Sequence, residues 1–257
     1  AVVTCTDQNA CTDDVCDPGL GCLFPENHCG NELCDCGETT GTCSADCLPS
    51  GSPDPEFGGG DGVVVSDFVL DDDEAVAAAL MGGGKILVGG RVRHATQGYN
   101  FLVAQYLPDG QLDPNFGENG GFTQTDLGDS KTDRAYAMAV GPNRIVTVGH
   151  GNVAGSGQRF AIVVYKLDGT LDTTFDAGGS KPGTRLLSGI LASSSTLYGA
   201  LVNADGTISV AGSGYPAAGD PRLAAARLLP SGEFDVSFAS NGHTVLGPIQ
   251  EGEDSGV

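Results

Sequence analysis

The nine cysteines carry the most distinctive chemistry of this 257-residue chain, and all of them precede Leu48. Pairs of thiols can oxidise to disulfides, and thiolates at short spacing can also bind zinc. Structural zinc sites commonly use C-x2-C pairs, whereas the spacings here are C-x5-C-x4-C-x5-C and C-x4-C-x8-C-x3-C. We therefore favour disulfides over zinc, and disulfides indicate an oxidising compartment.

The cysteine-rich segment also needs cross-links, because it is poor in large apolar residues. Leu20, Leu23, Phe24 and Leu33 are nearly all that it contains. So short a segment cannot bury enough surface to fold alone, whereas each disulfide contributes about 2–4 kcal/mol. Residues 1–47 are therefore predicted to form a small disulfide-rich module.

Two stretches of this module resemble known cysteine repeats. CTDQNACTDDVCDPGLGC resembles the CTDC-type repeat of secreted proteins. CGNELCDCGETTGTCSADC is similar to the myxobacterial-type disulfide repeat, although Glu32 stands where that repeat has glycine. The resemblances imply eight bonded cysteines: Cys5, Cys11, Cys16, Cys22, Cys29, Cys34, Cys43 and Cys47. Cys36 is left as the candidate unpaired thiol, free to link to another chain, be capped or stay buried, and a different pairing with a different leftover cysteine is the alternative.

Carboxylates lie between the cysteines, at Asp13, Asp14, Asp17, Asp35, Glu38 and Asp46. Their hard oxygens, held on tight loops, could coordinate calcium. The segment has no EF-hand-like D-x-[DN]-x-[DN]-G run. We therefore favour turn capping by these side chains, with calcium as the alternative. No cofactor is certain from the sequence.

From Leu48 onward the chain repeats a loop built around an aspartate. LPSGSPDPEFG at 48–58 returns as LPDGQLDPNFG at 107–117, KLDGTLDTTFD at 166–176 and LPSGEFDVSFA at 229–239. The shared aspartates are Asp54, Asp113, Asp172 and Asp235, so the periods are 59, 59 and 63 residues. These aspartates could form a ring that binds calcium or another ligand. We favour the simpler role of capping backbone amides in the same turn of every repeat.

Each repeat also contains four short apolar runs, which in the first repeat cover 75–81, 85–91, 101–107 and 121–127. Four strands in a period near 60 are typical of stacked modules or propeller blades. We predict a mainly β fold, in which residues 48–257 form a propeller-like array of four-stranded antiparallel blades. The three whole blades are predicted at about 75–127, 134–188 and 196–248.

The loop pattern L-P-[DS]-G-x-x-D-x-x-F-G resembles the delta-sixty repeat of bacterial surface and secreted proteins, which is taken to form β-propellers. The resemblance runs from about Leu48 to the end of the chain. It weakens in the last two copies, where Asp176 and Ala239 replace the final glycine. It implies a propeller fold and an extracellular or cell-surface location, and it brings no catalytic residues.

Both margins of the array are incomplete in the repeat pattern. Because the loop at Leu48 begins in mid-repeat, GVVVSDF at 62–68 is predicted to be a lone outer strand. EDSGV at 253–257 aligns with the start of a new first strand. Three whole repeats are fewer than the roughly 4–8 blades of a closed propeller. The chain could therefore be a fragment of a longer protein, associate with copies of itself, or form an open array capped by the cysteine module. Unpaired edges favour strand addition.

The net charge and the absence of catalytic motifs limit the classes of function that the sequence supports. A formal net charge of −21 disfavours nucleic acid and anionic lipid as partners, and no apolar run is long enough to predict a membrane span. The histidines are scattered, and no G-x-S-x-G nucleophile motif is present. We predict a non-enzymatic, exported structural, adhesive or interaction protein, without catalytic residues. Its predicted partners are copies of itself, a further part of the same protein, other surface proteins or glycans.

The alternative is a carbohydrate-binding or hydrolytic propeller. Its site would lie in the loops between strands, around His94, Tyr99, Asn100 and Tyr215. These loops carry few aromatic residues for stacking on sugars, which makes this alternative the weaker one.

Overall fold

A computed structural model describes residues 15–17, 21–23, 53–68, 72–128, 132–155 and 157–247. The chain divides into two compact units, Ala1–Val63 and Val64–Val257. In the first unit, β1 (Val15–Asp17) pairs antiparallel with β2 (Gly21–Leu23), which places Cys16 opposite Cys22. The other cysteines lie outside the described residues. So do five of the predicted calcium-binding or turn-capping carboxylates: Asp13, Asp14, Asp35, Glu38 and Asp46.

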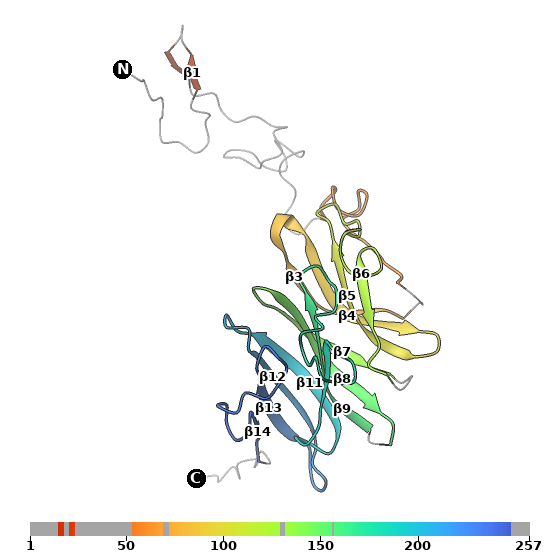
Figure 1. Cartoon of the computed structure of the whole chain (residues 1–257). Coiled ribbons are helices and arrows are strands. Elements are labelled where there is room, and N and C mark those ends of the chain that lie inside the picture. The colour runs from red at the N-terminus through yellow and green to blue at the C-terminus, as the bar shows by residue number, and fades with distance from the viewer. Residues whose placement is uncertain are drawn as a thin grey trace, which may run out of the picture. The chain divides into compact units, whose positions relative to one another are not determined.

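The second unit consists of three four-stranded antiparallel sheets that follow one another in chain order (Figure 1). Blade 1 contains β3 (Glu74–Leu80), β4 (Ile86–His94), β5 (Gly98–Tyr106) and β6 (Phe122–Thr125). Blade 2 contains β7 (Arg134–Val140), β8 (Arg144–Val153), β9 (Gly157–Lys166) and β10 (Thr184–Leu187). Blade 3 contains β11 (Ser193–Val202), β12 (Ile208–Tyr215), β13 (Arg222–Leu228) and β14 (His243–Val245).

Every strand of a blade pairs with the next strand along the chain. The only helix among the described residues is the short 3-10 turn η1 (Gly82–Gly84) between β3 and β4. The predicted mainly β, propeller-like array of four-stranded antiparallel blades is thereby confirmed. No helix in the described part of the chain is long and apolar enough to cross a membrane.

The segment at 62–68, predicted to be a lone outer strand without its usual partners, joins no sheet in the described structure. No strand of the described residues pairs with it, so it lacks the ladder hydrogen bonds by which a strand is defined. The remaining predicted strands of blade 1 are present, with their ends shifted by a few residues.

A β-bulge interrupts the first strand of each blade at the same register. The bulges fall between Ala75 and Ala77, between Ala135 and Ala137, and between Leu197 and Gly199. A glycine lies opposite each bulge, at Gly90, Gly149 and Gly212. A Cβ at these glycines would lie 2.1, 1.8 and 2.1 Å from a backbone carbonyl oxygen. The repeated glycines therefore let the bulged backbone approach closely.

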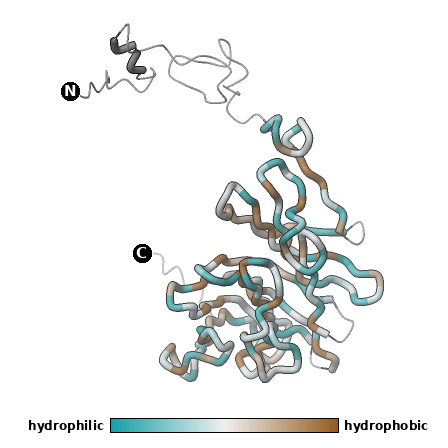
Figure 2. The backbone as a smooth tube through the Cα atoms, turned by 45° about the horizontal axis from the view of Figure 1, so that its top comes forward, coloured by the Kyte–Doolittle hydropathy of each residue, from teal (hydrophilic) through white to brown (hydrophobic). Residues whose placement is uncertain are grey.

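The hydrophobic core lies between the blades, with one cluster for each pair of neighbours. One cluster joins Leu87, Phe101 and Phe116 of blade 1 to residues of blade 2 such as Ile145 and Tyr165. The other joins blade 2 to blade 3. Figure 2 shows hydrophobic stretches interspersed with hydrophilic ones along the blades, as expected where alternate strand residues point to opposite sides. Each blade is thus stabilised by its neighbours, as in other repeat architectures.

Candidate interaction surface

The repeated loop aspartates cap turns. Asp113 Oδ1 accepts a hydrogen bond from the amide of Asn115 at 3.0 Å, and the amide of Phe116 donates to the backbone oxygen of Asp113. Asp54, Asp172 and Asp235 each accept the amide two residues further on, at 2.9, 3.1 and 3.0 Å. One carboxylate oxygen of every repeat therefore orders the same turn.

The second oxygen of three of these carboxylates faces a cation of its own blade. Lys85 Nζ lies 2.6 Å from Asp113 Oδ2, and Arg144 lies 3.5 Å from Asp172 Oδ2. The hydrogen bond from Lys85 lowers the pKa of Asp113, and so does the Asn115 amide. Among the described residues, no three His, Cys, Asp or Glu side chains gather into a group that could hold a metal ion. Calcium binding at these loops stays a prediction.

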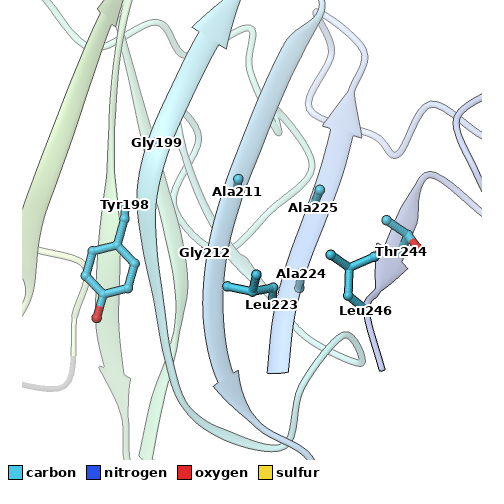
Figure 3. A pocket seen from close by; sticks show the side chains of 9 residues that line it. All are labelled: Tyr198, Gly199, Ala211, Gly212, Leu223, Ala224, Ala225, Thr244 and Leu246. Atoms are coloured by element: carbon cyan, nitrogen blue, oxygen red, sulfur yellow. The ribbon is translucent and has the colours of Figure 1, made fainter. Parts of the chain in front are cut away.

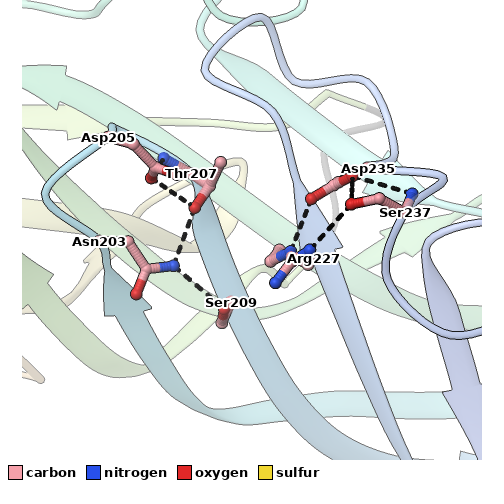
Figure 4. Close-up of polar contacts among 7 residues, drawn as sticks. All are labelled: Asn203, Asp205, Thr207, Ser209, Arg227, Asp235 and Ser237. Carbon is pink, nitrogen blue, oxygen red and sulfur yellow. Dashed lines mark hydrogen bonds and ion pairs between the residues drawn. The ribbon is translucent and has the colours of Figure 1, made fainter.

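The fourth loop shows the network in full (Figure 4). Asp235 Oδ2 accepts a hydrogen bond from Arg227 Nε at 2.6 Å, and its Oδ1 accepts from both the amide and the hydroxyl of Ser237. The Ser237 hydroxyl, followed by its amide, lowers the pKa of Asp235. Asp205 caps the turn between β11 and β12 in the same way, through Thr207. These carboxylates connect turns and strands, because they bind amides, hydroxyls and a guanidinium of their own blade.

The loops of neighbouring blades are also joined to one another. The amide of Gly117 donates to the backbone oxygen of Asp168, and the amide of Asp176 donates to that of Ser231, both at 2.7 Å. Phe116 and Phe175 are buried in the cores between blades. Phe238, the equivalent residue of the last loop, is only half-buried and lies under the Arg227 guanidinium. The last loop therefore lacks the cover that the other two receive.

The residues proposed for a sugar site are distributed over two blades. His94 ends β4 and Tyr99 and Asn100 lie in β5, whereas Tyr215 ends β12 in blade 3. The Tyr99 hydroxyl donates to Asp72, which raises the pKa of Tyr99. The Arg134 guanidinium lies 4.7 Å from the centre of the Tyr99 ring. One face of that ring is thus occupied by a cation, which leaves less of it for stacking on a sugar.

A chain of aromatic and guanidinium groups links the three blades near these residues. Arg91 pairs with Glu74, donates to the backbone oxygen of Ala135 and lies 5.3 Å from the Tyr136 ring centre. Tyr136 in turn meets Tyr198 edge to face at 5.5 Å. Sequence reasoning missed these residues, although arginine follows the paired glycines of the first repeat and an Arg-Ala-Tyr run begins the second.

Two link aspartates that sequence reasoning also missed join the end of one segment to the next blade. Asp133 is fully buried and accepts hydrogen bonds from the amides of Leu127 and Asn152, at 2.8 and 3.1 Å. Burial raises the pKa of Asp133 from its ordinary 3.8 to about 7. Asp73 accepts the amide of Phe68 at 2.8 Å in the same way.

A contiguous exposed apolar surface lies on blade 3. We call the side of a blade that faces the next blade along the chain its following side. On blade 3 this side carries a groove of about 440 Å³ with nine lining residues, none of them charged (Figure 3). They are Tyr198, Gly199, Ala211, Gly212, Leu223, Ala224, Ala225, Thr244 and Leu246. Leu223 is 47% exposed and Leu246 is 53% exposed.

Leu201 extends this surface, because it follows Gly199 by two residues in an unbroken stretch of ladder, and it is 67% exposed. We define the open face of blade 3 as the groove residues together with Leu201. Isolated exposed apolar residues are ordinary on a protein surface, but a contiguous apolar patch marks a site of interaction.

Comparison with known proteins identifies the repeat but not its activity. No curated protein matches the chain. The model of a family described as a domain of unknown function (DUF5122) beta-propeller matches residues 84–116, 143–175 and 204–238. Each matched segment runs from the turn before the second strand of a blade to the phenylalanine of the aspartate loop. The chain is therefore a β-propeller-type repeat protein, similar over these three segments to a family whose function is unknown.

Proposed function

We propose that the protein is a non-enzymatic, exported structural or interaction protein that acts by docking through the faces and edges of its blades. The observation that carries this proposal is the open face of blade 3, which is apolar, grooved and uncharged in a chain of net charge −21. Nine cysteines confined to the first 47 residues support an oxidising, extracellular setting.

The role of the loop carboxylates also supports docking rather than chemistry. A catalytic carboxylate needs access to a substrate, but the repeated aspartates are engaged by backbone amides and by cations of their own blades. Their engagement stabilises the loops and leaves the blade surfaces as the parts available to a partner.

The test combines association with a search for the alternative activity. We expect the whole chain to self-associate with rising concentration in analytical ultracentrifugation, and Leu201→Asp to abolish this association by placing a charge on the open face. Val236→Asp is the matched control, because Val236 is 75% exposed in the aspartate loop of the same blade and does not line the groove. Glycan-array binding or turnover in a hydrolase screen, unchanged in Leu201→Asp, would overturn the proposal in favour of a carbohydrate-directed propeller.

A further inference from the structure

The two interfaces inside the chain show what a following side accepts. The first strand of the next blade lies across it: β7 packs on blade 1 and β11 packs on blade 2. Strand β7 contributes Ala135, Met138 and Val140 to the core between blades 1 and 2. Strand β11 contributes Leu197, Ala200 and Val202 to the core between blades 2 and 3. The open face of blade 3 therefore continues an established interface and is shaped for an apolar sheet surface.

Strand β3 is the one first strand whose matching side chains are uncovered in the described structure. Its register relative to the bulge makes Ala75, Ala78 and Leu80 the equivalents of the β7 and β11 contact residues. All three are exposed, and Leu80 is 82% exposed. These exposed residues would suit a head-to-tail arrangement, in which β3 of a second copy packs on blade 3.

The segment 64–68 blocks that geometry. The Tyr106 hydroxyl donates to Ser66 Oγ at 2.8 Å, just as Tyr165 donates to Thr125 of β6 at 2.9 Å. The amide of Phe68 binds Asp73 as that of Leu127 binds Asp133. Residues 64–68 therefore occupy, on blade 1, the position that β6 occupies on blade 2. A complete blade 3 brings its own outer strand β14 to this position, so the two segments would overlap.

We propose, resting on the docking function proposed above, that the open face of blade 3 binds the same face of a second copy around a twofold axis. Such an interface uses one surface on both copies and closes at two chains. In this dimer the bulky rim of one copy meets the floor of small residues of the other. The rim consists of Leu201, Leu223 and Leu246, and the floor includes Gly199, Ala211 and Ala225. The groove residues and Leu201 carry no charge, and the charged side chain beside them, Arg227, is paired with Asp235. Two strongly acidic chains can therefore approach at this face without placing unpaired like charges in contact.

The experiment is sedimentation equilibrium of the whole oxidised chain and of Leu223→Asp, Leu80→Asp and Val236→Asp. Cys36→Ser is included to exclude a dimer made by a covalent bond between chains. The wild type is expected to reach twice its mass of 26.0 kDa and no more. Leu223→Asp is expected to weaken dimerisation at least 100-fold, because the twofold axis places the new charge in the interface twice. Leu80→Asp, Val236→Asp and Cys36→Ser are expected to dimerise like the wild type.

The outcomes separate this inference from the docking function on which it rests. Loss of association in Leu80→Asp, or growth beyond two chains, would show head-to-tail assembly and overturn the twofold dimer. If Leu223→Asp also abolished that assembly, docking through blade 3 would stand. A wild type that remains monomeric at every concentration would overturn the dimer outright. Association that is indifferent to both Leu223→Asp and Leu201→Asp would overturn the dimer and the role of the open face together.

Discussion

The following sides of blades 2 and 3 have the same architecture and opposite surroundings. Phe160 and Leu223 hold the same position, one residue before the alanine that pairs with the glycine opposite the bulge. Phe160 is 1% exposed, whereas Leu223 is 47% exposed. Two further pairs of equivalent positions are Val148 with Ala211 and Ile162 with Ala225. The covered blade carries the larger side chain in all three pairs.

The difference shows that a face contributes to the stability of the fold only where the next blade packs on it. Blade 2 obtains stability from a face that blade 3 fills, because Leu197 and the link residues Ile190 and Leu191 enter the same core. Blade 3 receives no such cover within the described chain. Its apolar residues therefore contribute little to the folding of one chain and remain available for association.

Truncation at the two equivalent positions is expected to give the largest contrast. Phe160→Ala should lower the free energy of unfolding by about 3–5 kcal/mol, because it opens a cavity in the core between blades 2 and 3. Leu223→Ala, measured on the monomer at low concentration, should change it by less than about 0.5 kcal/mol. Urea unfolding followed by circular dichroism measures both. Equal losses would show that blade 3 is covered in solution by another part of the same chain.

The glycines opposite the bulges should tolerate substitution equally poorly on blades 2 and 3, because their role does not depend on whether another blade packs on the face. A Cβ at Gly149 would lie 1.8 Å from the backbone oxygen of Arg134, and one at Gly212 would lie 2.1 Å from that of Thr196. Alanine at either position should cost about 1–3 kcal/mol, since backbone must move to admit it. Thermal unfolding of both variants checks this prediction. A much smaller loss in Gly212→Ala would indicate that the bulge of blade 3 is held less firmly.

The same comparison shows what the sequence could predict. The Asp and Phe of the repeated loop and the alternating apolar runs recur at a period near 60, so the number of strands per blade and their order followed from the pattern. The cores between blades could be anticipated for the same reason. Ladder pairing depends on a partner, and the segment at 62–68, predicted as an outer strand without its usual partners, is unpaired among the described residues.

The remaining features of the surface depend on contacts that no local pattern contains. Leu223 and Phe160 are both large apolar residues at equivalent positions of their repeats, yet the next blade covers only Phe160. Asp133 lies in a polar link that reads as a turn, yet its side chain is fully buried against two amides. Burial of this kind follows from the stacking of blades and not from spacing along the chain.

The two links between blades should differ in their response to pH. Asp133 has a folded-state pKa of about 7, above the ordinary 3.8, so the folded chain binds more protons than the unfolded chain between these values. Stability contributed by this group is therefore lost as the pH rises through that window, by up to about 1.4 kcal/mol per pH unit. The equivalent residue of blade 3 is Ser195, which lies within β11 and does not titrate in this range.

The variant Asp133→Asn should flatten this pH dependence while it costs about 1–3 kcal/mol at low pH, because an amide leaves one of the two backbone donors without an acceptor. His150 acts in the opposite direction. Burial and the nearby Arg134 and Arg91 lower its pKa to about 4, so its contribution is lost as the pH falls below about 6.5. Unfolding between pH 4.5 and 7.5 in the wild type, Asp133→Asn and His150→Gln separates the two groups. An unchanged slope in Asp133→Asn would rule out titration of this carboxyl in the folded chain.

The smallest expected effect lies at Gly199, on the open face itself. A Cβ at this position has nothing within 4 Å, and the equivalent residues of blades 1 and 2 are already Ala77 and Ala137. In the monomer, Gly199→Ala should raise the free energy of unfolding by about 0.4–1 kcal/mol, because alanine restricts the unfolded chain more than glycine does. In the dimer the same methyl would enter the groove floor that receives the partner's rim. The variant should therefore unfold at a higher temperature as a monomer and associate more weakly, and stabilisation with unchanged association would remove Gly199 from the interface.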